Sequence, residues 1–124
     1  MPKISGQARR IRIYIGEASK YKGTVLYHTI VLKAKELGLA GVTVFRGIEG
    51  FGANSRIKTA KILELSHDLP IVIDIVDSIE YIEKIIPFLD EAVQEGLITV
   101  EDLEIIRYSP KREPDKIKKD GNPQ

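Results

Sequence analysis

The sequence predicts an α+β fold of the ferredoxin-like kind, in which a four-stranded antiparallel sheet carries two helices on one face. Three observations predict it. Residues 10–16 alternate strictly between polar and apolar side chains, which is the period of a strand. A segment with helical spacing and a second strand follow, and after a long connection the order strand, helix, strand returns. This βαββαβ order is that of ferredoxin-like domains.

The first strand, helix and strand are expected within residues 10–45. Apolar residues recur at spacings of four, four and three between residues 26 and 37, which marks one face of a helix. They are Leu26, Ile30, Ala34 and Leu37. Thr24 is a suitable N-cap and Gly38 a suitable residue just beyond the C-cap. Residues 42–45 form the second predicted strand.

The connection between the two halves, residues 49–69, is longer than an ordinary loop, and loops of this length tend to be functional or mobile. Pro70 then precedes the most apolar strand of the sequence, residues 71–76, in which Asp74 is the one acid. A strand that is apolar on both faces needs cover on both sides.

The second helix is expected to begin at a capping box, residues 77–80, and to end near Gly96. Pro87 should kink it, because proline lacks the amide proton that the helix ladder uses. The predicted buried stripe consists of Ile79, Ile82, Ile86, Leu89 and Val93. A last strand lies within residues 97–108, and we expect it to be interrupted around Glu101 and Asp102.

Length and composition predict one domain in a reducing compartment. The chain has 124 residues, a net charge of +1 and no cysteine. We expect a flexible N-terminus at residues 1–8, a folded domain at 9–108 and a disordered basic tail at 109–124. Without cysteine there is no disulfide framework or thiolate zinc site, and a cytoplasmic location is expected. No apolar run reaches about 20 residues, so membrane insertion is not expected.

Right-handed crossovers would place the first and third strands in the middle of the sheet and both helices on one face. The opposite face would then carry Tyr14, Phe45, Val72 and Val76. Soluble monomers seldom expose such a patch, so we expect one or two further copies of the chain to cover it. Arg12 and Asp74 would be neighbours on the central strands. A hydrogen-bonded pair is the preferred interpretation, and a lone functional aspartate is the alternative.

The segment after the second strand, residues 46–56, looks least like core. It holds three glycines with an arginine at each end. Glycine is used where the backbone takes positive φ or approaches another group closely, and exposed amides beside cations suit an anion such as phosphate. The candidate ligand-binding residues are Arg46, Gly47, Gly50, Phe51, Gly52, Asn54, Arg56 and Lys58. A tight turn with solvated arginines explains the same pattern.

Enzymatic and metal-binding patterns are weak. His28 lies on the first predicted helix and His67 in the long connection, and neither has a second imidazole or a cysteine at ligand spacing. His67 and Asp68 could form a base and its orienting acid, although adjacent loop residues more often cap a strand. We therefore predict no catalytic residues and no metal.

Residues 46–52, Arg-Gly-Ile-Glu-Gly-Phe-Gly, together with Ser55-Arg56 and residues 68–73, resemble the PII-like proteins. The likeness is to a domain-of-unknown-function branch of the nitrogen-regulatory PII superfamily, and it covers residues 9–108. It implies a ferredoxin-like subunit that assembles as a homotrimer with the sheets turned inward. It also implies that residues 49–69 correspond to the T-loop, which meets partner proteins, and that adenine nucleotides bind in clefts between subunits.

The resemblance carries over only in part. Gly50, Phe51 and Gly52 match the Gly-Phe-Gly at the base of the PII loop, where backbone amides approach phosphates. Ala53 and Asn54 stand where PII proteins have glutamine and lysine, and residues 94–99 replace their second phosphate loop, Gly-Asp-Gly-Lys. The tyrosine that is modified in PII proteins is missing, so regulation by uridylylation is not expected.

These observations predict a non-enzymatic, trimeric PII-like protein that senses a small anionic metabolite, an adenine nucleotide in the first instance, and signals through residues 49–69. It would need no cofactor. RNA binding on an uncovered sheet face is the alternative, with Arg10, Arg12 and Tyr14 as its support. The net charge of +1 argues against it. A small enzyme with a site between subunits is a third possibility, for which the sequence names no reaction.

Overall fold

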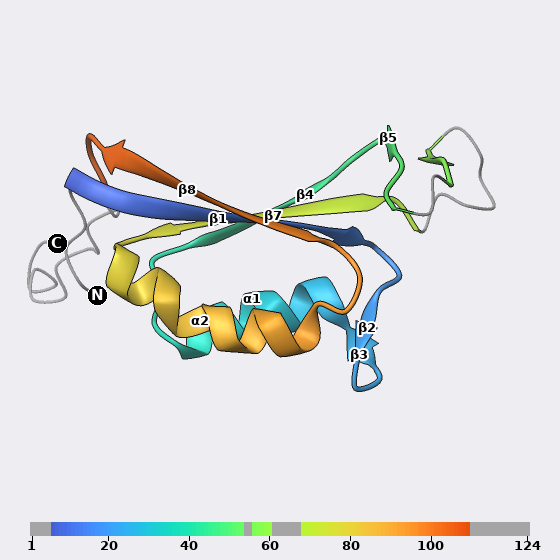
Figure 1. Ribbon diagram of the computed structural model, residues 1–124, viewed down its shortest axis with the longest axis horizontal. Helices are drawn as coiled ribbons and strands as arrows, with labels where there is room; N and C mark the ends of the chain where they lie inside the picture. The colour runs from blue at the N-terminus through green and yellow to red at the C-terminus, as the bar shows by residue number, and fades with distance from the viewer. Residues whose placement is uncertain (1–5, 54–55, 61–67, 110–124) are drawn as a thin grey trace, which may run out of the picture.

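The computed structural model describes residues 6–53, 56–60 and 68–109. Its main sheet has the strand order β4-β7-β1-β8, and all neighbouring strands are antiparallel. The strands are β1 (Gly6–Gly16), β4 (Val42–Arg46), β7 (Pro70–Asp77) and β8 (Leu97–Ile105). Both helices, α1 (Leu26–Glu36) and α2 (Ile79–Ala92), cover the same face of this sheet (Figure 1). The predicted ferredoxin-like fold is confirmed, with β1 and β7 in the centre.

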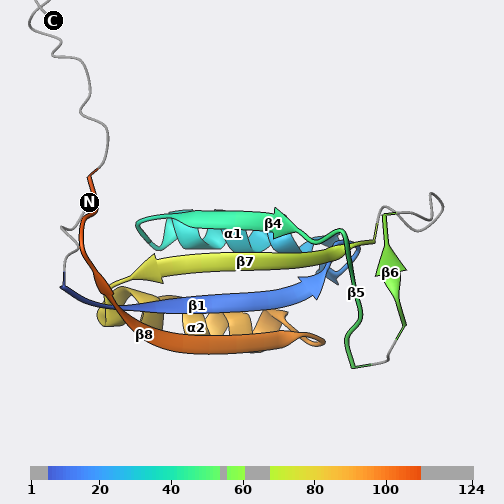
Figure 2. The same cartoon turned by 90° about the horizontal axis from the view of Figure 1, so that it is seen from above.

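Two short hairpins complete the described elements. One, β2 (Lys20–Tyr21) with β3 (Thr24–Val25), joins β1 to α1. The other, β5 (Glu49–Gly50) with β6 (Lys58–Thr59), lies beyond the end of the main sheet (Figure 2). The long connection predicted at residues 49–69 therefore contains a hairpin at its base, and residues 54–55 and 61–67 lie outside the described part.

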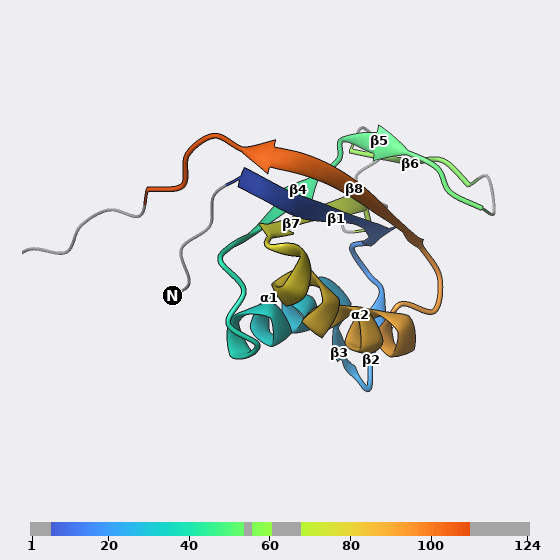
Figure 3. The ribbon, with the colours of Figure 1, turned by 60° about the vertical axis from the view of Figure 1, so that its left-hand side comes forward.

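The helices and the main sheet form two layers (Figure 3), and the hydrophobic core lies between them. Isoleucines of the two central strands point toward the helices and are at most 6% exposed: Ile11, Ile13, Ile15, Ile71, Ile73 and Ile75. They pack against Leu26, Ile30 and Ala34 of α1, the predicted stripe. Strand alternation places these residues on one face because successive side chains point to opposite sides.

The core stripe of α2 differs in phase from the prediction. Its buried residues are Ile82, Ile85, Leu89 and Ala92. Ile86, which the sequence placed in the stripe, is 38% exposed, and the helix ends at Ala92 rather than near Gly96. A run of neighbouring isoleucines fits two helical phases, and contact with the sheet selects the one that begins at Ile82. The helix runs on through Pro87.

The helix caps agree with expectation except at the start of α1. Val25, not Thr24, is the N-cap of α1, and its side chain makes no cap hydrogen bond. Thr24 instead lies in β3, and its hydroxyl donates to the carbonyl of Tyr21. At α2 the cap is Ser78, whose Oγ accepts from the amide of Tyr81. Gly38 follows the C-cap of α1 with φ of 83°, as predicted.

The sheet is more extensive than the sequence indicated. β1 begins at Gly6, within the segment expected to be flexible, and Ala8 is fully buried. β8 is continuous from Leu97 to Ile105, so the predicted interruption at Glu101 and Asp102 is wrong. These acids remain in the strand because each binds an arginine of β1: Asp102 binds Arg9, and Glu101 binds Arg10.

Candidate functional site

A groove of about 900 Å³ lies where the ends of β1 and β7 meet the β5–β6 hairpin. We call it the hairpin groove. The residues that line it come from the end of β1 and its connection to β2, the connection from β4 to β5, the β5–β6 hairpin, the start of β7 and the residues just before it, and the connection from α2 into β8. Segments from across the sequence therefore contribute to one lining.

Glycines bring the hairpin close to Pro70. A Cβ atom built on Gly47 would lie 3.3 Å from Cβ of Pro70, and one on Gly50 would lie 3.1 Å from its Cγ. The amide of Gly47 donates to the carbonyl oxygen of Pro70 at 2.7 Å. Neither glycine is among the described residues with positive φ. Their lack of a side chain allows this close contact, whereas Gly52 has open space around it.

Two carboxylates fasten the segments around the groove. Glu17 accepts from the guanidinium of Arg46 and from the amide of Leu69, the latter at 3.2 Å. Asp68 accepts from the ammonium group of Lys58 and, through Oδ1, from the amide of Ala18 at 2.9 Å. The connection after β1 is thereby tied to the end of β4 and to β6.

The structure brings together most of the predicted binding residues. Those that line the hairpin groove are Gly47, Gly50, Phe51, Gly52, Arg56 and Lys58. Arg46 is not in the lining, and its guanidinium binds Glu17. Gly50 pairs with Lys58 in the β5–β6 ladder. Asn54 lies outside the described residues, as does His67.

Sequence reasoning missed Glu17 and Asp68 as parts of this region. A signal was present, because Glu17 follows β1 and Asp68 precedes β7, and the register pairs Gly16 with Pro70. Residues just beyond paired strand ends must meet. Glu49, Asp68 and Glu95 give the described lining three acids beside Arg56 and Lys58.

Sequence reasoning also missed Gly96, which lines the groove at the connection from α2 to β8. A Cβ atom there would lie 2.6 Å from the carbonyl oxygen of Tyr14 and 3.0 Å from Cγ2 of Ile15. Real Cβ atoms do not approach a backbone oxygen so closely, so the turn from α2 into β8 requires glycine here.

On the open face of the sheet, opposite the helices, the side chains form rows that run across the strands. Register pairs Phe45 with Val72, Val72 with Tyr14, and Tyr14 with Leu97, which forms an apolar row over all four strands. Phe45 is 51% exposed and Leu97 is 55% exposed. Tyr14, Val72 and Leu97 also line the hairpin groove, so the apolar row borders it.

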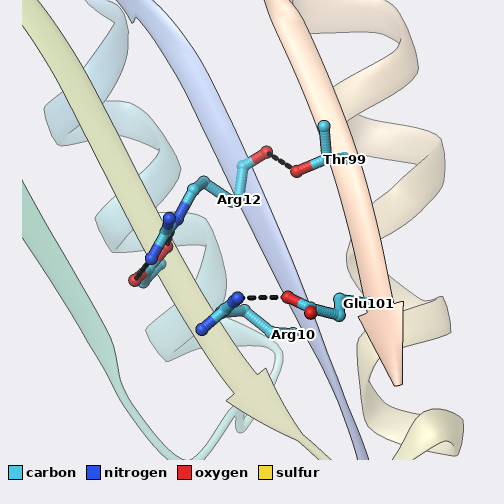
Figure 4. A network of polar contacts seen from close by, with 5 residues as sticks. Arg10, Arg12, Thr99 and Glu101 are labelled. Carbon is cyan, nitrogen blue, oxygen red and sulfur yellow. Dashed lines mark hydrogen bonds and ion pairs between the residues drawn. The ribbon is translucent and has the colours of Figure 1, made fainter. Parts of the chain in front are cut away.

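The next two rows of the open face hold ion pairs, and Val76, which the sequence placed on this face, lies beside Arg10 in the second of them. Arg12 binds Asp74 through two hydrogen bonds of 2.6 and 2.7 Å, which confirms the predicted pair. This hydrogen-bonded pairing lowers the pKa of Asp74 and raises the pKa of the Arg12 guanidinium. Arg10 binds Glu101 on β8 (Figure 4). The arginines that supported RNA binding are therefore both neutralised by acids.

Within residues 6–53, 56–60 and 68–109 there is no group of three or more His, Cys, Asp or Glu side chains that could hold a metal ion. Among these residues no helix has the length and apolar character needed to cross a membrane.

Comparison with known proteins identifies relatives along most of the chain. Residues 8–105 match the sequence profile of the DUF190 family, described as Uncharacterized ACR. A UPF0166 protein of Aquifex aeolicus is 40% identical over 98 residues, which are 77% of this chain and 90% of that protein. A UPF0166 protein of Methanocaldococcus jannaschii is 33% identical over 102 residues, 82% of this chain and 94% of that protein.

Solved structures share the fold at low sequence identity. A protein of Thermus thermophilus described as a PII-like signaling protein has a TM-score of 0.60 at 18% identity, over 85% of this chain and 94% of that one. CPII of Thiomonas intermedia, a nitrogen regulatory PII-like protein bound to ADP, AMP and bicarbonate, has a TM-score of 0.55 at 20% identity, over 82% and 90%. The fold is thus PII-like.

Proposed function

The chain belongs to the DUF190 family and has a PII-like fold, and from this premise we propose that it is a regulatory protein that binds an adenine nucleotide in the hairpin groove. We further propose that it acts as a homotrimer and meets a partner protein through residues 49–69. CPII, which has the same fold, binds ADP and AMP.

The observation that carries this proposal is the two-sided lining of the hairpin groove. Its hairpin side holds Arg56 and Lys58, and its sheet side holds the apolar surface of Tyr14, Val72 and Leu97. A nucleotide has matching halves, because its phosphates suit cations and backbone amides while its base suits an aromatic or aliphatic wall. The volume of about 900 Å³ lies within the range of small-molecule sites.

The apolar row supports assembly. Phe45, Val72, Tyr14 and Leu97 form a continuous band on the face of the sheet that no helix covers. Burying such a band between copies would be favourable, at roughly 25 cal/mol for each Å² of apolar surface removed from water. Since the row borders the groove, copies that cover the row would also reach the ligand.

The hairpin supports contact with a partner protein. Large apolar side chains in and beside it are strongly exposed: Ile48 at 78%, Phe51 at 69% and Ile57 at 58%. Exposed apolar groups on and beside a hairpin suit insertion into an apolar pocket of another protein. RNA binding has less support, because Arg10 and Arg12 both bind acids.

We propose no catalysis. Of the described residues that line the groove, none is a histidine or a cysteine. The lining does include Ser19, Lys58 and Asp68, and we assign Lys58 and Asp68 to their ion pair and to ligand binding rather than to proton transfer.

Isothermal titration calorimetry with ATP, ADP, AMP and cyclic AMP tests the binding proposal, on protein shown to be folded and free of copurified ligand. We expect heat from at least one nucleotide and about tenfold weaker binding by Lys58→Gln, since a charge-assisted hydrogen bond is lost. Lys35→Gln, which removes an exposed charge on α1, should bind like the wild type. Absence of heat from all four nucleotides would refute nucleotide binding.

A further inference from the structure

The ion pair between Lys58 and Asp68 sits in the groove where the proposed ligand would bind. Both residues line the hairpin groove, and both side chains are 26% exposed. Lys58 belongs to β6, and Asp68 lies just before β7. The pair therefore joins the hairpin to the rest of the domain within the groove lining.

We infer that Asp68 is an internal competitor for the anionic ligand, which holds Lys58 when the groove is empty and releases it to the phosphate when the groove is filled. This inference rests on the proposed function, and it names the residue that regulates the same groove. A carboxylate and a phosphate are alternative partners for the same ammonium group.

The contacts indicate which of the two partners moves. Asp68 is held in place by a second bond, in which its Oδ1 accepts from the amide of Ala18 at 2.9 Å. Gly16 leaves room for it, since a Cβ atom on that residue would lie 3.2 Å from the same oxygen. Lysine carries its charge on a flexible four-carbon stem, so Lys58 can turn to a new partner while Asp68 stays.

The exchange has two consequences. The apparent affinity for the ligand is lower than it would be without Asp68. The ligand must compete with Asp68 for Lys58, and only part of the protein population has Lys58 available. The link between the hairpin and the rest of the domain also changes, because Lys58 then binds the ligand instead of Asp68. Since residues 49–69 would meet the partner protein, occupancy of the groove is coupled to the base of that segment.

The test is a comparison of two variants that remove one negative charge each from the lining. Asp68→Asn removes the competitor and keeps an oxygen that can accept from Ala18. Glu95→Gln removes a charge elsewhere in the lining and serves as the matched control. Calorimetric titrations with ADP and with pyrophosphate, at one low salt concentration, give the dissociation constants.

We expect Asp68→Asn to bind ADP and pyrophosphate about three- to tenfold more tightly than the wild type, and Glu95→Gln to change affinity less. Lys58→Gln should cost more affinity in the Asp68→Asn background than in the wild type, because Lys58 is fully available there. Equal gains for the two acid variants, or no gain for Asp68→Asn, would overturn the inference while nucleotide binding stands. Failure of the wild type to bind any nucleotide would instead overturn the proposed function.

A structural readout separates exchange from a general charge effect. In the wild type, ADP should shift the NMR signal of the Lys58 ammonium group and leave the amide of Ala18 protected from hydrogen exchange, because Asp68 keeps that bond. Loss of Ala18 protection on ADP binding would show that Asp68 moves instead of Lys58, which contradicts the mechanism.

Discussion

The guanidinium of Arg12 faces the carboxylate of Asp74 across the two central strands, with Nε 2.6 Å from Oδ1 and Nη2 2.7 Å from Oδ2. This two-point contact lies in the row directly beside the apolar row of Phe45, Val72, Tyr14 and Leu97. The open face therefore combines a fixed polar pair with an exposed apolar band, and both bear on the predictions below.

The Arg12–Asp74 pair should make stability depend on pH. Its hydrogen bonds lower the pKa of Asp74 below the ordinary 3.8, so the unfolded chain takes up the proton first as pH falls. The stabilisation is then fully present above about pH 5 and is lost as the pH drops through the lowered folded-state pKa.

Urea unfolding of the wild type and Asp74→Asn at pH 7 and pH 3 measures this effect. We expect the variant to unfold at a lower urea concentration than the wild type at pH 7, and we expect that difference to be smaller at pH 3. Asp102→Asn removes a more exposed carboxylate that also binds an arginine, so it should have a smaller effect at pH 7. A difference for Asp74→Asn that is independent of pH would contradict the assignment.

Replacing Gly96 by alanine should destabilise the fold. The added Cβ would lie 2.6 Å from the carbonyl oxygen of Tyr14, so the start of β8 must move away from β1. We expect a loss of about 1–3 kcal/mol in the free energy of unfolding, as for other overpacked sites. Gly41→Ala is the control, because a Cβ there meets nothing within 4 Å. Equal stability of the two variants in thermal or urea unfolding would disprove the close-approach argument.

Asp77 should be important for stability although it makes no contact with the groove lining described above. Its side chain is fully buried, and its two oxygens accept from the amides of Ala40 and Ser78 at 2.8 and 2.6 Å. Asp77→Ala leaves both donors buried without this partner, so we expect a loss of about 2–4 kcal/mol in unfolding free energy.

Asp90→Asn, at an exposed position of α2, is the control for Asp77→Ala and should change the unfolding free energy by less than about 0.5 kcal/mol. Chemical unfolding followed by circular dichroism measures both. A stable Asp77→Ala variant would mean that the α1–β4 connection does not depend on this carboxylate.

The apolar row should control assembly if the proposed trimer is correct. Leu97→Asp puts a charge at the end of the apolar row, beside Tyr14. Burying that charge in an interface is costly. Size-exclusion chromatography with light scattering should show the wild type at the mass of three chains and the variant at the mass of one. Leu32→Asp, on α1 at a site that is 53% exposed, should leave the mass unchanged. A monomeric wild type would rule out the trimer.

The sequence by itself determined the element order, the central position of β1 and β7, the core isoleucines and the Arg12–Asp74 pair. These follow from period-two and helical spacing together with the handedness of crossovers, all of which are local or topological rules. The segment at residues 46–52, which carries the resemblance to PII-like proteins, contributes five residues to the lining of the hairpin groove.

Only the tertiary structure decided which groups meet at strand ends and which helical phase is buried. The sequence could not tell Ile85 from Ile86 as a core residue, because neighbouring isoleucines fit both phases until the sheet selects one. Nor could it show that Arg46 binds Glu17 or that Lys58 binds Asp68, since their partners are 29 and 10 residues away and are set by register. Gly96 is required for a similar reason, because the carbonyl oxygen of Tyr14 that it approaches belongs to another segment, and Gly47 and Gly50 lie against the ring of Pro70, which only folding brings near.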